Sequence, residues 1–318
     1  MMAAGCISTA AQAQTPSPAS TDLGKVSAAT SGITTFRFAP STGAVTVVSG
    51  SGQRISTTAV RFLVSIACTN NNYCRNQNMK VVVGSIGTPS GRLGLLTNFT
   101  FANNTANLIS GPTGTNPITF TIGPIGNNNA VNFYIGADAP LYGDDQTSKP
   151  TGAANSSINV TTSQTNGNGA INAGTAVTAT VSRNLSIGPT ASLNFGTIYR
   201  PTSGSSTISI PASTGVRSIS GTGAGGYIAP TPSRAAFTIS GEGGQTVSIS
   251  VPSSISLIKG TTTLTVLTSN TGQGTQILSN SSGSGGSFSF YIGGAFAITN
   301  TTPTGAYSGT YTVTVSYN

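Results

Sequence analysis

Histidine is absent from this sequence, and charged side chains are scarce. The 318 residues include 13 Lys and Arg, 5 Asp and Glu, and no His. The Ser-His-Asp and Cys-His arrangements of nucleophilic enzymes are therefore excluded. A glycosidase needs two carboxylates facing each other across a cleft, and three of the five acids lie within residues 138–145. No phosphate-binding or dinucleotide-binding glycine motif is present. We therefore expect a protein that is not an enzyme and that carries no cofactor and no metal.

Only 6% of the residues are charged, against about a quarter in an average globular chain. Disordered chains combine low hydrophobicity with high charge, whereas this chain is 36% hydrophobic. Ser, Thr, Asn and Gly replace the missing charge, as they do in exported β-proteins. The basic residues are scattered singly, so we do not expect nucleic acid as a partner. The net charge of +8 favours weak attraction to an acidic polysaccharide or an anionic cell surface, or serves only solubility.

The first residues resemble the end of a signal peptide. Residues 1–13 are mostly small and apolar and finish in Ala11-Gln12-Ala13, a typical cleavage site. The basic segment that should come first is missing, so the true start could lie upstream. Alternatively, Cys6 is the lipid-bearing cysteine of a lipoprotein. No other apolar run approaches the roughly 18 residues of a membrane span. We expect export through the periplasm to the cell surface or the medium, with no transmembrane span.

Cysteine is also rare, with three in the chain. Apart from Cys6, the pair Cys68 and Cys74 flanks a short polar turn. In an oxidising compartment such a pair predicts a small disulfide loop. Free thiols are the alternative, and two thiols without histidine make a poor zinc site.

Short runs with strict period two recur along the chain, as in residues 246–251 and 311–315. Alternation with β-branched residues indicates half-buried strands, and clusters of Gly, Asn, Ser and Pro separate them. This pattern is typical of a sandwich. We therefore predict an all-β fold of two tandem immunoglobulin-like antiparallel β-sandwich domains.

An internal repeat sets the domain count at two. Its anchors are the pairs Phe38 and Phe195, Phe133-Tyr134-Ile135-Gly136 and Phe290-Tyr291-Ile292-Gly293, and Pro150 and Pro303. The predicted boundaries are a signal-peptide remnant at 1–13, a flexible segment at 14–32, a first domain at 33–164, a linker at 165–173, and a second domain at 174–318.

The second domain carries a set of recognisable segments. It opens with Val177-Thr178-Ala179-Thr180-Val181, contains Leu193-Asn194-Phe195-Gly196-Thr197-Ile198, and closes with a run from Gly305 to Asn318. Residues 174–318 resemble the bacterial domain-of-unknown-function family number 4402. That family is found in exported proteins and is similar to spore-coat-U-type and chaperone–usher fimbrial subunit domains.

The closing strand also resembles the C-terminus of chaperone–usher pilins. Tyr317 is penultimate and Gly305 is fourteenth from the end, as in those subunits. The resemblance implies strand pairing with a periplasmic chaperone, with an usher as further partner, and a recognition row of Tyr311, Val313, Val315 and Tyr317. A plain terminal core strand is the alternative. Residues 14–33 make a weak donor strand, whereas residues 177–187 make a better one that could complete either domain.

The segment around Asp138, Asp144 and Asp145 is the one polar cluster in the sequence. Calcium binds six to eight oxygens, so three Asp could supply half a shell, although a solvated turn explains them equally. We place Tyr73 and Tyr142 on loops, where binding residues are common. Together these five residues form the candidate ligand loop, with glycan as a candidate ligand.

Two functions follow. The first is an exported bacterial cell-surface structural subunit of a fimbria-like or coat-like assembly, interacting by β-strand pairing with other surface subunits or with itself. The alternative is a two-domain adhesin or secreted carbohydrate-binding protein whose first domain carries the ligand site.

Overall fold

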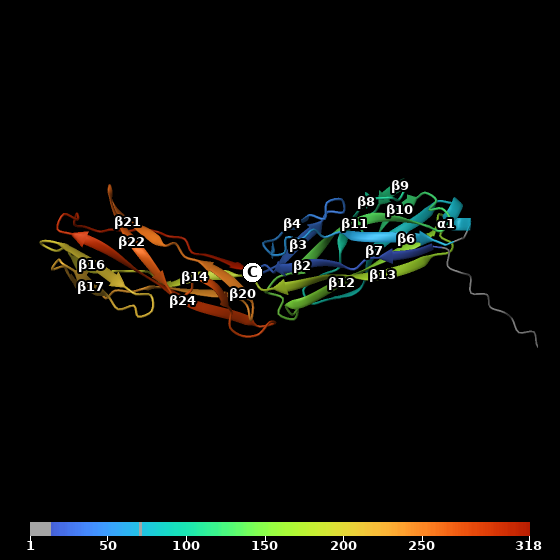
Figure 1. The fold of residues 1–318 in the computed structure, drawn as a ribbon. Coiled ribbons are helices and arrows are strands. Elements are labelled where there is room, and N and C mark those ends of the chain that lie inside the picture. The colour runs from blue at the N-terminus through green and yellow to red at the C-terminus, as the bar shows by residue number, and fades with distance from the viewer. Residues whose placement is uncertain (1–13, 70–71) are drawn as a thin grey trace, which may run out of the picture. The chain divides into compact units, whose positions relative to one another are not determined.

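The computed structural model describes residues 14–69 and 72–318. The chain divides into unit 1, which ends at Arg183, and unit 2, which runs from Asn184 to Asn318 (Figure 1). The proposed signal peptide and Cys6 lie outside the described residues. None of the described helices is long and apolar enough to cross a membrane.

Unit 1 is a sandwich of two β-sheets. The first sheet has the order β1-β6-β11-β3-β4, with β8 also pairing with β11, and the second has the order β5-β2-β13-β12-β7-β10-β9. All pairs are antiparallel except β2 with β13. The elements are β1 (Gln14–Pro18), β2 (Thr21–Ser27), β3 (Ile33–Phe38), β4 (Val45–Ser49), β5 (Gln53–Arg54), β6 (Phe62–Cys68), α1 (Asn72–Asn76), β7 (Met79–Ser90), β8 (Thr97–Asn103), β9 (Leu108–Thr113), β10 (Ile118–Ile122), β11 (Asn129–Tyr142), β12 (Gly152–Gln164) and β13 (Ile171–Ser182).

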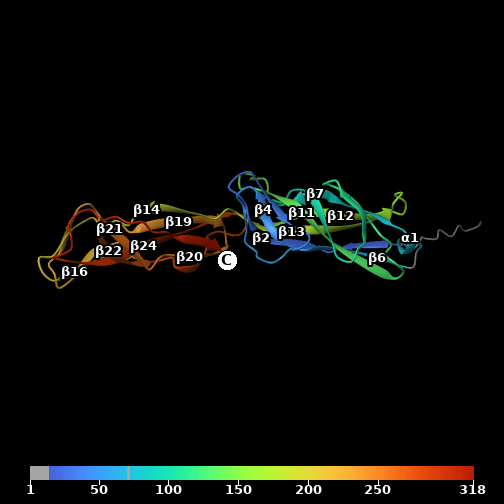
Figure 2. The same ribbon diagram turned by 90° about the horizontal axis from the view of Figure 1, so that it is seen from above.

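Strict alternation gives unit 1 a single continuous core. In β6, Phe62, Val64 and Ile66 point inward and are fully buried, while the residues between them are partly exposed. Successive side chains of a strand point to opposite faces, so the period-two pattern places one row of each strand between the sheets. Figure 2 shows the strands of unit 1 from a second direction.

Unit 2 contains three sheets. The largest has the order β14-β19-β24-β16-β17, with the hairpin β21-β22 joined to β24; the others are β23-β20-β25 and the ribbon β15-β18. The strands are β14 (Ser186–Ala191), β15 (Thr197–Tyr199), β16 (Ser205–Ile210), β17 (Ser218–Gly221), β18 (Gly226–Ile228), β19 (Ala235–Glu242), β20 (Thr246–Ser250), β21 (Ser254–Lys259), β22 (Thr262–Asn270), β23 (Gly274–Ile277), β24 (Gly285–Thr299) and β25 (Thr314–Tyr317). The predicted all-β fold of two tandem sandwiches is confirmed.

The core of unit 2 is split. One cluster surrounds Phe290 and Ile292, and a second surrounds Phe195 and Phe296, whose rings meet edge to face with centroids 4.8 Å apart. Tyr311 packs against both clusters.

The two units share a plan centred on β11 and β24. Phe133 lies opposite Val64 in β6, and Phe290 lies opposite Phe237 in β19, so this anchor of the sequence repeat marks equivalent positions. The anchor Phe38 with Phe195 is wrong. Phe38 lies opposite Ala137, and the corresponding position, opposite Gly294, is Ile210. Phe38 lies 95 residues before Phe133, whereas Ile210 lies only 80 before Phe290. Equal spacing in the sequence therefore selects Phe195, which lies in the second cluster.

The repeated glycines explain why the Phe-Tyr-Ile-Gly motif recurs. A Cβ on Gly136 would lie 2.5 Å from the Phe38 carbonyl oxygen, and one on Gly293 would lie 2.0 Å from the Ile210 carbonyl oxygen. The neighbouring strand therefore passes too close for any side chain at either position.

We expect Gly293→Ala to lower the free energy of unfolding of unit 2 by roughly 1–3 kcal/mol, because the methyl group would force β24 and β16 apart. Urea unfolding of the full chain measures this. Gly285→Ala on the same strand is the control, since its Cβ would meet no atom within 4 Å. Equal stability of the two variants would refute the close-approach explanation.

Three predicted segments differ from the structure. Residues 14–32, expected to be flexible, form β1 and β2 and pair with β6 and β13. The second domain, expected to begin at 174, begins after Arg183, because β13 forms a long hairpin with β12. The predicted linker at 165–173 is the turn of that hairpin and the start of β13.

Candidate functional site

The terminal strand β25 is the edge of its three-stranded sheet. It pairs antiparallel with β20, with Val315 opposite Ile249 and Tyr317 opposite Val247. The Tyr317 hydroxyl accepts a hydrogen bond of 2.7 Å from the Glu242 backbone N–H in β19. A Cβ on Gly241 would lie 2.4 Å from that hydroxyl, so the glycine makes room for it. The penultimate aromatic thereby ties the two sheets together.

The segment that leads into β25 is irregular. Ser308 forms an isolated bridge with Ile258 of β21, through backbone hydrogen bonds of 2.7 and 3.2 Å. Gly305 has a φ of +133°, a conformation that favours glycine. Burial raises the pKa of the Tyr311 hydroxyl. The predicted row of Tyr311, Val313, Val315 and Tyr317 packs against the core of unit 2.

A cleft of about 840 Å³ opens beside this segment. Its apolar walls include Phe195, Ile255, Leu257, Val266, Phe296 and Ile298, and residues 302–309 line its other side. The cleft therefore adjoins the second cluster of the divided core. An opening of this size next to a core cluster leaves side chains such as Phe195 and Phe296 without full contact.

Unit 1 has strands in the corresponding place. There β12 pairs on one side with β7 and on the other with β13, and β13 in turn pairs with β2. These two added strands bury five apolar side chains in the core: Leu23, Val26, Val177, Ala179 and Val181. Among the described residues of unit 2, no strand covers β25 in this way.

The aspartates of the candidate ligand loop each contact groups of the protein. Asp138 lies within β11 and not on a loop. It accepts hydrogen bonds from Arg37 Nε and Nη2, at 2.6 and 2.7 Å, and from Asn98 Nδ2 at 2.8 Å. The hydrogen bonding between Arg37 and Asp138, and secondly the negative charge of Asp138, raise the pKa of the Arg37 guanidinium. Asp138 is therefore a structural side chain.

Asp144 and Asp145 follow β11 in a turn. Asp144 forms an ion pair with Arg92, whose side chain is 1% exposed, and Arg92 Nε also donates to the Lys149 carbonyl at 3.1 Å. Asp145 accepts from the Gly32 N–H at 3.1 Å. The described residues contain no group of three or more His, Cys, Asp or Glu side chains able to hold a metal ion. The three aspartates are thus divided among separate partners.

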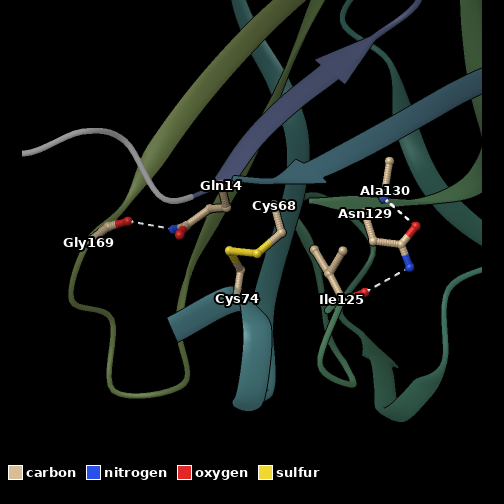
Figure 3. Close-up of a disulfide and its surroundings, with 7 residues drawn as sticks. All are labelled: Gln14, Cys68, Cys74, Ile125, Asn129, Ala130 and Gly169. Carbon is tan, nitrogen blue, oxygen red and sulfur yellow. Dashed lines mark hydrogen bonds between the residues drawn. A yellow bond between two sulfur atoms is a disulfide. The ribbon is translucent and has the colours of Figure 1, made fainter. Parts of the chain in front are cut away.

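The structure separates the two tyrosines of the candidate ligand loop. The predicted disulfide between Cys68 and Cys74 is confirmed (Figure 3). The exposed Tyr73, next to Cys74 in the chain, therefore lies at the end of unit 1 where Asn129 is opposite Cys68. Tyr142 ends β11, thirteen residues after Asn129, which is roughly 40 Å at about 3.3 Å per residue. The Lys149 ammonium lies 4.3 Å from the centre of the Tyr142 ring. The five residues therefore do not form one site.

Residues 185–317, nearly all of unit 2, match the family model "Domain of unknown function (DUF4402)". This match confirms the resemblance predicted for the second domain. No curated protein matches the chain.

Among solved structures, the chain is similar to the CsuC–CsuE chaperone–tip adhesion subunit pre-assembly complex of archaic chaperone–usher Csu pili from Acinetobacter baumannii. The identity is 13%, the TM-score is 0.28, and the alignment covers 79% of this chain and 88% of that one. A chaperone–tip adhesin complex of CFA/I fimbriae gives 10% identity, a TM-score of 0.23, and coverage of 80% and 89%. An adhesin from Mobiluncus mulieris gives 7%, 0.19, and coverage of 72% and 88%.

Proposed function

We propose that this protein is an exported, non-enzymatic bacterial surface subunit that joins a fimbria-like or coat-like assembly by accepting a β-strand into unit 2. The observation that carries the proposal is the difference between the units. In unit 1, β2 and β13 complete the sandwich beside β12, whereas in unit 2 the strand β25 is an edge, and residues 302–309, in the segment that leads into it, line a cleft next to the second core cluster. Strand edges tend to be paired, covered or blunted, and added strands are a common mode of protein recognition.

The accepted strand needs a particular chemistry. One side of the cleft is formed by apolar side chains such as Phe195, Leu257 and Phe296, so alternate residues of a partner strand that reaches it should be large and apolar. Lys259 and Arg200 lie beside the cleft and donate to backbone carbonyls of Thr304 and Thr302. Arg217 donates to the carbonyl of Phe195, another lining residue. All three cations are bonded to backbone carbonyls of this chain, so the partner strand needs no strong charge of its own.

The described N-terminal strands favour a different chain as the donor over a second copy. Both β1 and β2 are paired within unit 1, and so is β13. The described part of the chain therefore accepts a strand without offering one, which suits a subunit at the end of an assembly. This favours the two-domain adhesin, in which unit 1 carries the ligand site, and a periplasmic chaperone or usher-bound subunit would supply the strand before and during assembly.

A synthetic strand tests the proposal. We expect an 11-residue peptide of alternating Thr and Ile or Val to bind the full chain and to stabilise unit 2 alone. At a free concentration of a hundred times its Kd, the gain is about 2.7 kcal/mol. Calorimetry gives the Kd, and urea unfolding followed by NMR signals of each unit gives the stabilisation.

A peptide with the same apolar residues and Pro in place of every second Thr is the control, because Pro cannot donate to a strand ladder. Equal binding of both peptides would show that they bind through apolar contact alone and not by strand pairing. Stabilisation of unit 1 in place of unit 2 would overturn the assignment of the open edge.

A further inference from the structure

Four turns of unit 1 meet at the end of the sandwich that contains the disulfide. We name residues 73–78, 103–107, 123–129 and 165–170 the amide-rich end. The strand registers bring them together, since Asn129 lies opposite Cys68, Gln164 opposite Met79, and Ile122 opposite Leu108. The ends of a sandwich are where its loops gather and where related folds place their binding surfaces.

Backbone contacts hold these turns in fixed positions. The Ile125 N–H donates to the Cys74 carbonyl at 2.8 Å and the Gly123 N–H donates to the Asn107 carbonyl at 2.7 Å. Gln14 Nε2 donates to the Gly169 carbonyl at 2.7 Å, and the disulfide joins Cys68 to Cys74 (Figure 3). A surface whose backbone is ordered in advance loses less entropy on binding.

The exposed side chains of these turns are mainly amides. The exposed members are Asn76, Gln77, Asn103, Asn104, Asn107, Asn127, Asn128, Asn129, Asn166 and Asn168. Each amide carries both hydrogen-bond donors and an acceptor. Tyr73 adds an aromatic ring that is 45% exposed. Tyr, Asn, Gly and Ser are also the residues that dominate antibody binding loops, where Tyr supplies contact area and Asn supplies adaptable hydrogen bonding.

The near absence of charge from the amide-rich end indicates which class of ligand it can bind. Arg75 is the one charged residue in the four ranges, whereas Asp138, Asp144 and Asp145 belong to β11's far end and the turn after it. A protein partner would present many charges of both signs. Such a partner binds best to a surface that carries charged groups opposite its own. A neutral glycan carries no charge, and its neighbouring hydroxyl groups both donate and accept hydrogen bonds, as amides do.

We propose that the amide-rich end of unit 1 binds a neutral glycan, with Tyr73 packing against a sugar ring and the surrounding amides bonding its hydroxyl groups. The proposal gives a ligand class and a position to the adhesive role proposed above, and in that sense rests on it. Of the five residues of the candidate ligand loop, only Tyr73 belongs to the amide-rich end.

Immobilised neutral polysaccharides test the proposal on the full chain. The probes are dextran, mannan and chitin oligomers, with hyaluronate and alginate as acidic counterparts. We expect saturable binding to at least one neutral probe that persists at 0.5 M salt, roughly the range in which charge attraction is screened. The triple variant Asn76→Ala, Asn127→Ala, Asn166→Ala should bind that probe roughly 100-fold more weakly, since three hydrogen bonds are lost. Tyr73→Ala alone should weaken it about 10-fold.

The matched control removes three exposed amides elsewhere on unit 1, as Gln53→Ala, Gln146→Ala, Asn155→Ala. We expect its binding to stay within about twofold of wild type. No binding of wild type to any neutral probe, binding only to the acidic probes with loss at high salt, or equal weakening in the control would each overturn the proposal. The strand-peptide experiment on unit 2 reads out separately, so the glycan site can fail while strand acceptance holds, and the reverse.

Discussion

Asp144→Ala is expected to lower the free energy of unfolding of unit 1 by roughly 3–5 kcal/mol, because removing one member of a buried ion pair leaves the other charge without compensation. The stranded group is the Arg92 guanidinium, whose side chain is 1% exposed, while Asp144 is 22% exposed. Arg92 would retain the Lys149 carbonyl, which accepts a hydrogen bond but carries no full charge. Urea unfolding followed by NMR signals of unit 1 measures the loss.

The neighbouring Asp145→Ala is the control. Its side chain is in an exposed position and bonds the Gly32 N–H, so the expected cost is about 1 kcal/mol or less. The two substitutions remove the same charge one residue apart. If both cost the same, Arg92 finds other compensation and the turn after β11 is not held by this pair. Addition of calcium should stabilise neither variant nor the wild type, because the three aspartates bond different partners.

The sequence was sufficient for the fold class because alternation is a local property. In β6 and β12 the buried residues follow period two without exception over several positions, and such a pattern indicates a half-buried strand by itself. The disulfide was also predictable, because Cys68 and Cys74 are near neighbours in the chain and few other partners exist.

The allocation of β13 could not be predicted, because it depends on competition between distant strands. Val177, Ala179 and Val181 would suit the core of either domain, and the sequence left both open. In the structure they are buried in unit 1, where β13 forms a hairpin with β12 through a short turn. The closeness of the hairpin partner explains the outcome, since closing a short loop costs less entropy than closing a long one.

The prediction that five residues form one candidate ligand loop was wrong for a related reason. Proximity in sequence suggested that Asp138, Asp144 and Tyr142 belonged together in the candidate ligand loop, but β11 continues as one strand to Tyr142. Gly136 is required by the close approach of β3, and Pro140 lies in the strand, opposite Thr35. Neither contact is visible before the neighbouring strand is placed.

The largest difference in amide exchange rate is expected between the open side of β25 and the side of β12 that pairs with β13. Alternate amides of a strand point to the same side. The Asn318 N–H donates to Thr246, the residue that begins β20, so the Val315 amide points away from β20. The amides of β12 on the corresponding side face β13. Amides bonded inside a sheet exchange only on unfolding, whereas open-edge amides exchange through small fluctuations.

Hydrogen exchange of the free, monomeric full chain, recorded by NMR, therefore tests the central claim most directly. We expect the Val315 amide to exchange roughly a thousandfold or more faster than the β12 amides that face β13, and to become protected when the strand peptide is bound. Equal protection of Val315 and β12 in the free monomer would show that unit 2 is already complete and would contradict its role as a strand acceptor.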